Sequence, residues 1–158
     1  YPQRAIRTHD HVLIMNFRPD RWPLGDPYRL EEGPEPTQQE LETNTRLTLS
    51  DEDAGPTKAW LVQSRKKDSW KMLFKQVYGK RPNIELFHIK QDPFEMHNLA
   101  GEEQYAAVEE ELTKSLLYEM RRTGDPRLIR EGAFYETPPM AGPLKEKSPG
   151  WKNQKRRP

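Results

Sequence analysis

The feature that most constrains this fold is the stretch 85–100, which reads E-L-F-H-I-K-Q-D-P-F-E-M-H-N-L-A. It opens with an apolar run whose aromatic and β-branched residues favour a β-strand. Asp92 and Pro93 then favour a turn, because aspartate bonds the turn backbone and proline fixes φ and donates no N–H. A second bend at Asn98 leads into a long helical pattern. The stretch therefore predicts a strand, a tight turn and the start of a helix in direct succession.

Composition limits how large a core can surround that stretch. Only 33% of the 158 residues are hydrophobic and the mean hydropathy is −1.08, whereas apolar residues make up nearly half of an ordinary globular domain. Fifteen prolines indicate that much of the chain is irregular. The length therefore predicts one domain with tails and a modest core.

Cysteine is absent from the sequence, which excludes disulfides, thiolate metal sites and a cysteine nucleophile. No run approaches the roughly 18 apolar residues of a membrane-spanning helix. No signal peptide opens the sequence, which begins at Tyr1 without an initiating methionine. We therefore expect a fragment of a longer protein.

Before residue 85 the sequence predicts a hairpin, a loop and three helices. Two β-prone runs at 5–8 and 12–17 flank a short polar link, and the second is nearly all apolar, so a covering element, the C-terminal helix, is expected over it. An irregular proline-rich loop follows at 18–36. Thr37 with Glu40 predicts a capping box, and Gly55-Pro56 predicts the start of a second helix.

The third predicted helix runs from about 68 to 78. Asp68 or Ser69 is expected to cap it, and Gly79 to follow it as the C′ residue. Its apolar residues share one helical face: Trp70, Leu73, Phe74 and Val77.

A long amphipathic helix is predicted at 102–123. Its apolar residues recur at intervals of three and four: Tyr105, Val108, Leu112, Leu116 and Met120. Early glutamates and late arginines suit the helix dipole, and Gly124 and Pro126 mark its end. From 127 the chain has no lasting period, which predicts an extended arm with Phe134, Tyr135 and Trp151 as scattered anchors.

The histidines and one tryptophan are the residues that suggest a site. His9 and His11 could lie on one side of the hairpin and hold a metal ion or an anion, although no third ligand is evident. His88 is expected on the outer face of its strand and His97 in a loop. Trp22 lies among charged residues on the 18–36 loop, where it either contacts a ligand or packs back as a lid over the core.

No complete catalytic motif is present. The sequence lacks a P-loop, a G-x-G-x-x-G segment and a G-x-S-x-G segment. The basic end K-E-K-S-P-G-W-K-N-Q-K-R-R-P either binds a phosphate or sulfate polyanion or is a solvated tail.

Three segments, in this order, resemble the C-terminal part of a sulfatase, nearest to the sulfamidase (heparan N-sulfatase) branch. Y-P-Q-R-A-I-R-T at the start resembles the Y-P-x-R strand that begins that subdomain. The stretch 85–100 resembles the E-L-Y-D-x-x-x-D-P-x-E-x-x-N-L-A signature before the family's last long helix. R-T-G-D-P-R-L at 122–128 resembles the T-x-D-P that closes that helix. The departures are Phe87 for the usual Tyr and His88 for the usual Asp.

The resemblance implies an α+β fold of the alkaline-phosphatase-like superfamily. It consists of a small antiparallel sheet with the long amphipathic helix packed on it, long proline-rich loops and an extended C-terminal arm. The expected organisation is a subdomain at 1–126, with an irregular loop insertion at 18–55, and an extended basic tail at 127–158.

The resemblance also implies a sulfatase that hydrolyses sulfate esters or N-sulfate groups on sugars. The family's formylglycine nucleophile, made in a C/S-x-P-S/A-R motif, and its Ca²⁺ ligands belong to a larger N-terminal domain. This chain has no such motif, so no catalytic or metal-binding residue is expected in it. It would buttress that domain and close one side of the substrate cleft.

The partners implied are therefore the N-terminal catalytic domain and a sulfated saccharide, without nucleic acid or a membrane span. The family resemblance places the protein in the periplasm, outside the cell or in lysosomes. Six residues are the expected substrate contacts, because the planar fork of arginine suits sulfate oxygens and the others lie beside the arginines: Arg7, His9, His11, Arg18, Arg21 and Trp22.

Two alternatives remain open. The six residues could hold an interdomain surface instead of a substrate. The chain could also be a non-catalytic binding module that uses its basic tail on a polyanion. A stand-alone module should fold cooperatively by itself, whereas a severed subdomain should be marginal and expose an apolar face.

Overall fold

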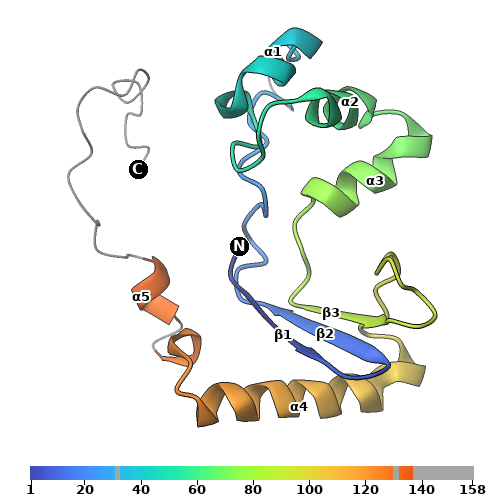
Figure 1. Cartoon of the computed structure of the whole chain (residues 1–158), viewed down its shortest axis with the longest axis vertical. Coiled ribbons are helices and arrows are strands. Elements are labelled where there is room, and N and C mark those ends of the chain that lie inside the picture. The colour runs from blue at the N-terminus through green and yellow to red at the C-terminus, as the bar shows by residue number, and fades with distance from the viewer. Residues whose placement is uncertain (31–32, 130–131, 137–158) are drawn as a thin grey trace. The chain divides into compact units, whose positions relative to one another are not determined.

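The computed structural model describes residues 1–30, 33–129 and 132–136. The chain divides into two compact units, Tyr1–Tyr118 and Glu119–Pro158, and each is described by itself. The architecture is α+β, with a three-stranded antiparallel sheet and several helices (Figure 1). The predicted fold class is confirmed at that level.

The sheet consists of β1 (Gln3–Arg7), β2 (His11–Asn16) and β3 (Ile84–His88) in the order β1-β2-β3. The predicted hairpin is confirmed, because β1 pairs antiparallel with β2. β2 also pairs antiparallel with β3, from a distant part of the chain, in a register that sets Leu13 opposite Leu86.

The central strand β2 is covered on both faces. Leu13 and Leu86 are fully buried, and Val12 and Phe87, which point to the opposite face, are less than a tenth exposed. A strand buried on both sides must be apolar at successive positions. This explains the nearly continuous apolar run in the sequence.

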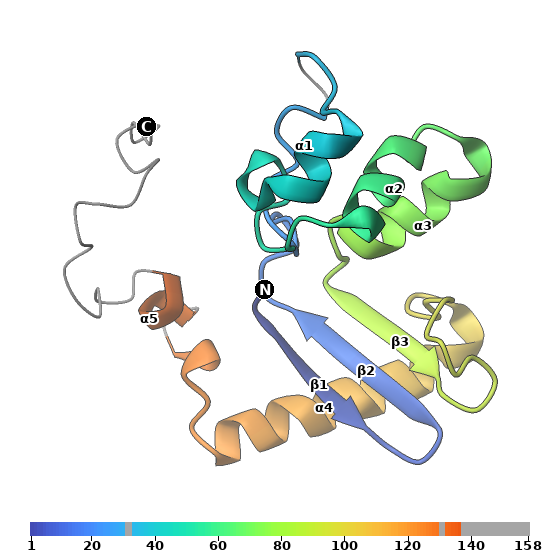
Figure 2. The same ribbon diagram turned by 45° about the horizontal axis from the view of Figure 1, so that its top comes forward.

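The part of the helix α4 (Ala106–Arg122) that belongs to the first unit lies along one face of the sheet (Figures 1 and 2). It follows a 3₁₀ turn, η2 (Glu103–Tyr105). Leu112 and Leu116 on its apolar stripe are about one-twentieth exposed. The predicted stripe therefore forms the buried side of the helix.

The larger hydrophobic cluster lies among the other helices of this unit, which are α1 (Gln38–Thr43), α2 (Pro56–Ser64) and α3 (Asp68–Tyr78). A 3₁₀ turn, η1 (Thr45–Leu47), follows α1. Four leucines of the cluster come from the expected loop insertion at 18–55, and its buried members are Leu30, Leu41, Leu47, Leu49, Ala59, Leu61, Val62 and Tyr78.

The capping box predicted at the start of α1 is confirmed. The Glu40 N–H donates to the Thr37 hydroxyl at 3.2 Å, and the Thr37 N–H donates to the Glu40 carboxylate at 2.9 Å. Both bonds satisfy N–H groups that have no partner inside the helix.

Two predictions about α3 are wrong. Lys67 occupies the N-cap position and its side chain makes no capping bond, so neither Asp68 nor Ser69 caps this helix. Gly79 has a φ of −66° and is not left-handed. Glycine is required there because a Cβ atom would lie 2.4 Å from the Lys75 carbonyl oxygen.

Lys58 is a charged residue inside the helical cluster, about 1% exposed. Its ammonium group donates to the carbonyl oxygens of Thr45 at 3.2 Å, Leu49 at 3.0 Å and Glu52 at 2.9 Å. Burial lowers the pKa of Lys58, while the nearby Glu52 and Asp53 carboxylates act in the opposite direction. The ammonium group thus ties the 45–52 segment to α2.

The second unit begins within α4. The Gly124 N–H donates to the Arg121 carbonyl at 3.1 Å and the Asp125 N–H to the Met120 carbonyl at 2.8 Å. With φ of +66° at Gly124, this pair of bonds is a Schellman motif, and the predicted stop is confirmed.

Two short helices follow that the sequence did not predict, η3 (Pro126–Leu128) and α5 (Ala133–Glu136). The guanidinium of Arg127 is buried and bonds the Glu136 carboxylate at 2.7 Å. Trp151 and the basic end of the chain lie outside the described residues.

Candidate functional site

The tip of the β1–β2 hairpin carries two of the expected contacts. His9 bonds Asp10 at 3.1 Å, and the Lys90 ammonium bonds both His9 Nδ1 at 2.8 Å and Asp10 Oδ1 at 2.7 Å. The hydrogen bond from Lys90 holds the pKa of Asp10 below its ordinary value. The charges of Lys90 and Asp10 therefore neutralise each other at this exposed tip, which is not a vacant anion site.

His11 has other neighbours than His9. Its ring contacts that of His88 at 4.6 Å between centroids and that of Tyr105 at 6.4 Å. Its buried Nε2 atom has no hydrogen-bond partner among the described residues. The expectation that His88 lies on the outer face is wrong, because the register places it beside His11 and both rings are half-buried. His97 lies in a loop, as predicted.

Arg7 ends β1 and forms an ion pair with Glu95 at 3.8 Å. It lies in the same end of the sheet as the hairpin tip. Its side chain is 62% exposed, so the pair is worth little in stability, and the guanidinium remains reachable from solvent.

Arg18 and Arg21 lie beyond the other end of β2. Arg18 makes a two-pronged contact with Asp20, from Nε at 2.9 Å and from Nη2 at 2.8 Å. The hydrogen bond from Arg18 lowers the pKa of Asp20 to about 2. Arg18 is therefore neutralised by its own loop, while Arg21 donates its backbone N–H to the Arg18 carbonyl at 3.0 Å.

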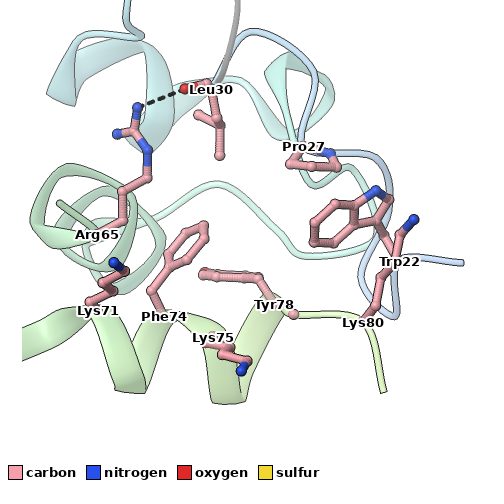
Figure 3. Close-up of a pocket in the computed structure, with 10 residues that line it drawn as sticks. Trp22, Pro27, Leu30, Arg65, Lys71, Phe74, Lys75, Tyr78 and Lys80 are labelled. Carbon is pink, nitrogen blue, oxygen red and sulfur yellow. Dashed lines mark hydrogen bonds between the residues drawn. The ribbon is translucent and has the colours of Figure 1, made fainter. Parts of the chain in front are cut away.

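Trp22 packs back towards the helical cluster, as one of the two alternatives predicted. The Lys80 ammonium lies 5.2 Å from the centre of its ring. The ring lines a pocket together with Phe74 and Tyr78 of α3 (Figure 3).

The six residues therefore do not converge on one site. Arg7, His9 and His11 lie at one end of β2, whereas Arg18, Arg21 and Trp22 lie beyond its other end. A strand of this length separates them by about 17 Å at 3.3 Å per residue. The structure thus has two separate groups where the sequence suggested one substrate-binding surface.

The connection between β3 and α4 is the most tightly built loop in this part of the chain. The Asn98 side-chain oxygen accepts from the Leu86 N–H at 2.9 Å and the Ala100 N–H at 3.0 Å, and its NH₂ group donates to the Ile84 carbonyl at 3.4 Å. The Leu99 N–H donates to the Leu86 carbonyl at 2.8 Å. Residues 98–99 therefore extend the hydrogen bonding along the free side of β3.

Asp92 holds the first half of the same connection. Its carboxylate accepts from the His97 N–H at 2.7 Å, and its own N–H donates to the His88 carbonyl at 2.8 Å. These bonds fix the turn predicted at 91–93. Phe94 directly follows this turn and is 83% exposed.

No family model matches this chain. A 53-residue segment, 34% of the chain, is 38% identical to an uncharacterized protein of Haemophilus influenzae. That segment covers 27% of the Haemophilus protein, so the match identifies neither a family nor an activity.

In the part of the chain that the structure describes, no three His, Asp or Glu side chains gather in a way that could hold a metal ion. Among the same residues, no helix has both the length and the apolar character needed to span a bilayer.

Sequence reasoning missed the partners of Trp22. The apolar face of the third helix was predicted, but Lys80 beyond its end and the lysines on its solvent side were not singled out. The signal available was the cluster of lysines at 66–80 among three aromatic residues. Only the tertiary structure brings Trp22, from 50 residues earlier, against it.

Proposed function

We propose that this chain is the C-terminal subdomain of a formylglycine-dependent sulfatase of the alkaline-phosphatase-like superfamily, nearest to the sulfamidases. The complete protein would hydrolyse sulfate esters or N-sulfate groups on sugars. This chain would buttress the catalytic domain, which would contribute the formylglycine and the Ca²⁺ ligands. The compartment would be the periplasm, the extracellular space or the lysosome.

The observation that carries this proposal is the connection between β3 and α4. Asp92, Asn98, Leu99 and Ala100 are residues at which the sequence matches the sulfatase signature, and each makes a backbone or side-chain bond that fixes this connection. A signature of this kind is expected to persist because it sets the path from a strand to a helix. The resemblance therefore concerns residues that fix the path from a strand to a helix, which agrees with a supporting role for this chain.

Exposed apolar side chains near this connection support a neighbouring domain as the partner. Phe94 is 83% exposed, Met72 68% and Met96 41%. Ile14 and Phe87 of the sheet line a groove of about 480 Å³ together with residues of α3 and of the 94–98 segment. Apolar side chains exposed together in this way mark interaction surfaces more often than free surface.

The direct test is sulfate release by the complete protein that contains this sequence. With Ca²⁺ present, it should release sulfate from 4-nitrophenyl sulfate or from N-sulfoglucosamine, and the 158-residue chain alone should release none. A complete protein without a C/S-x-P-S/A-R segment, or one inert on both substrates, would refute the proposal.

The supporting role has its own test in Phe94→Asp. In the isolated chain this change should alter the free energy of unfolding by less than about 0.5 kcal/mol, because the side chain is exposed. In the complete protein it should cost about 2 kcal/mol or more, since a charge would enter an apolar interface. Phe94→Leu is the matched control and should be tolerated in both. Equal effects of Phe94→Asp in the two proteins would place the catalytic domain elsewhere.

A further inference from the structure

A pocket of about 470 Å³ opens between α3 and the loop that carries Trp22 (Figure 3). This volume lies in the range of small-molecule sites. The aromatic floor is formed by the partly buried Phe74 ring, and the fully buried Tyr78 ring lies behind it, 5.0 Å away and tilted by 52°. Pro27 and Leu30 complete the apolar wall.

The rim of the pocket is cationic. Lys71, Lys75 and Lys80 line it, and no carboxylate does so among the described residues. In Figure 3, Lys71 and Lys80 flank the aromatic floor from its two sides. No ion pair with an acidic side chain involves these three lysines in the described part of the chain.

Arg65 also lines the pocket, but its guanidinium is committed to the fold. It donates to the Val62 carbonyl at 2.8 Å and the Leu30 carbonyl at 3.0 Å, and it bonds Glu35 at 3.1 Å. These bonds fix the wall formed by Leu30. The positive charges available to a ligand are therefore those of the lysines.

We propose that this pocket binds a ring-shaped ligand that has an apolar face and carries a sulfate or phosphate group. The apolar face would lie on the aromatic floor and against Trp22, while the tetrahedral anion would lie at the rim, where the positive charges of Lys71 and Lys80 attract it. Lysine suits this role because its compact charge attracts an oxyanion from several directions. Lys80, already over the Trp22 ring, would bring charge next to a ring stacked there.

The inference does not depend on sulfatase activity. The pocket is built by the 22–30 loop and α3, whereas the sulfatase resemblance at its most specific rests on β3, the connection after it and the end of α4. Binding is measurable on the 158-residue chain, in which no catalysis is expected. If the pocket bound no ligand, the proposal that this chain is a sulfatase subdomain would still stand. If the complete protein released no sulfate, the proposal for the pocket would still stand.

The test is a titration followed by ¹H–¹⁵N NMR, in which the Trp22 indole N–H signal is assigned with a Trp22→Phe variant. Two probes distinguish the source of the ring: 2-naphthyl sulfate for aryl ligands and N-sulfoglucosamine for sugars. Saturable shifts at Trp22 and in α3 with either probe support the proposal and assign the ligand class. Two control ligands separate the contributions of the ring and of the anion. 2-Naphthol lacks the anion, and inorganic sulfate lacks the ring.

The double variant Lys71→Gln/Lys80→Gln should weaken binding of the active probe about tenfold, as expected for the loss of two solvent-exposed charge contacts. Both side chains are exposed, so the fold should survive. Lys114→Gln, on α4 and ion-paired with Glu110, removes one like charge away from the pocket and should leave the affinity unchanged.

Four outcomes would overturn the proposal. These are no shift with either probe, shifts confined to residues outside the pocket, 2-naphthol or inorganic sulfate binding as tightly as the charged ring, and unchanged affinity in the double variant.

Discussion

Two regions of the first unit differ in how they bury their apolar and charged side chains. The helical region, residues 24–79, buries most of its leucines and even the charge of Lys58, although Trp60, Trp70 and Met72 on its surface stay exposed. The sheet region comprises β1 to β3, the 91–101 connection and α4 up to residue 118. It buries the centre of β2 but leaves Phe94 and Met96 exposed.

The difference shows which region is complete by itself. In the helical region, the buried Lys58 ammonium donates to three backbone carbonyls. In the sheet region, the bonds of Asn98 fix the backbone while apolar side chains of the same loop point outwards. We infer that the helical region stabilises the chain and that the sheet region, together with the adjoining face of α3, offers the surface for a partner.

The largest expected effect comes from Lys58→Met. The change keeps the length of the side chain but leaves three carbonyl oxygens without their donor inside the helical cluster. It should lower the free energy of unfolding by about 3 kcal/mol, measured by urea denaturation. Lys71→Met, at an exposed position of the same region, is the control and should change the free energy by less than about 0.5 kcal/mol. A tolerated Lys58→Met would break the contrast between the two regions.

The next effect is expected from Asn98→Ala, which removes the bonds to the Leu86 and Ala100 N–H groups. The cost should be about 2 kcal/mol. Hydrogen exchange should accelerate at Leu86 and in the 94–100 segment while the amides of α2 keep their protection. The control is Asn83→Ala, an exposed asparagine close to β3. Equal acceleration in α2 would mean that the two regions unfold as one.

The smallest effect is a pH dependence that reports on Tyr78. Burial raises the pKa of this hydroxyl above its ordinary value of 10.0, and its hydrogen bond to Glu52 acts in the same direction. Above pH 10 the unfolded chain loses this proton and the folded chain keeps it, so the folded state becomes less stable as the pH rises. In Tyr78→Phe the decline between pH 10 and 11 should be smaller by about 1 kcal/mol, because the unfolded hydroxyl is half ionised at pH 10 and almost fully ionised at pH 11.

That experiment compares urea denaturation of the two proteins at several alkaline pH values. The other tyrosines titrate in both, so the difference isolates Tyr78. Identical slopes would show that the helical cluster opens to water before the hydroxyl ionises. The helical region would then be less well shielded from water than the burial of its side chains indicates.

Local sequence rules predicted much of the secondary structure. The Thr37–Glu40 capping box, the stop of α4 at Gly124 and the turn at Asp92 are each set by residues within a few positions of one another, so the chain needs no distant contact to specify them. Gly79 shows the limit of such rules. Its position after a helix suggested a left-handed conformation, but the reason for glycine is its close approach to the Lys75 carbonyl.

The expected site was less predictable, because spacing along a sequence does not give distance in space. Arg7 and Arg18 both flank the hairpin strands, yet they lie at opposite ends of β2. His9 and His11 are two positions apart, but the turn directs His9 to solvent and β2 directs His11 towards His88. The sequence also gave no sign that Arg18 would be occupied by Asp20.

By itself, the sequence determined the α+β class, the hairpin, the capping box of α1, the stop of α4 and the strand–turn–helix order at 85–106. These features rest on backbone preferences and on the periodicity of apolar residues, which act over one or two turns of chain. The tertiary structure alone decided that β3 pairs with β2 across 70 residues, that Lys58 is buried and that Trp22 meets α3. Those outcomes depend on which apolar surfaces exclude water together, and that is a property of the whole packed chain.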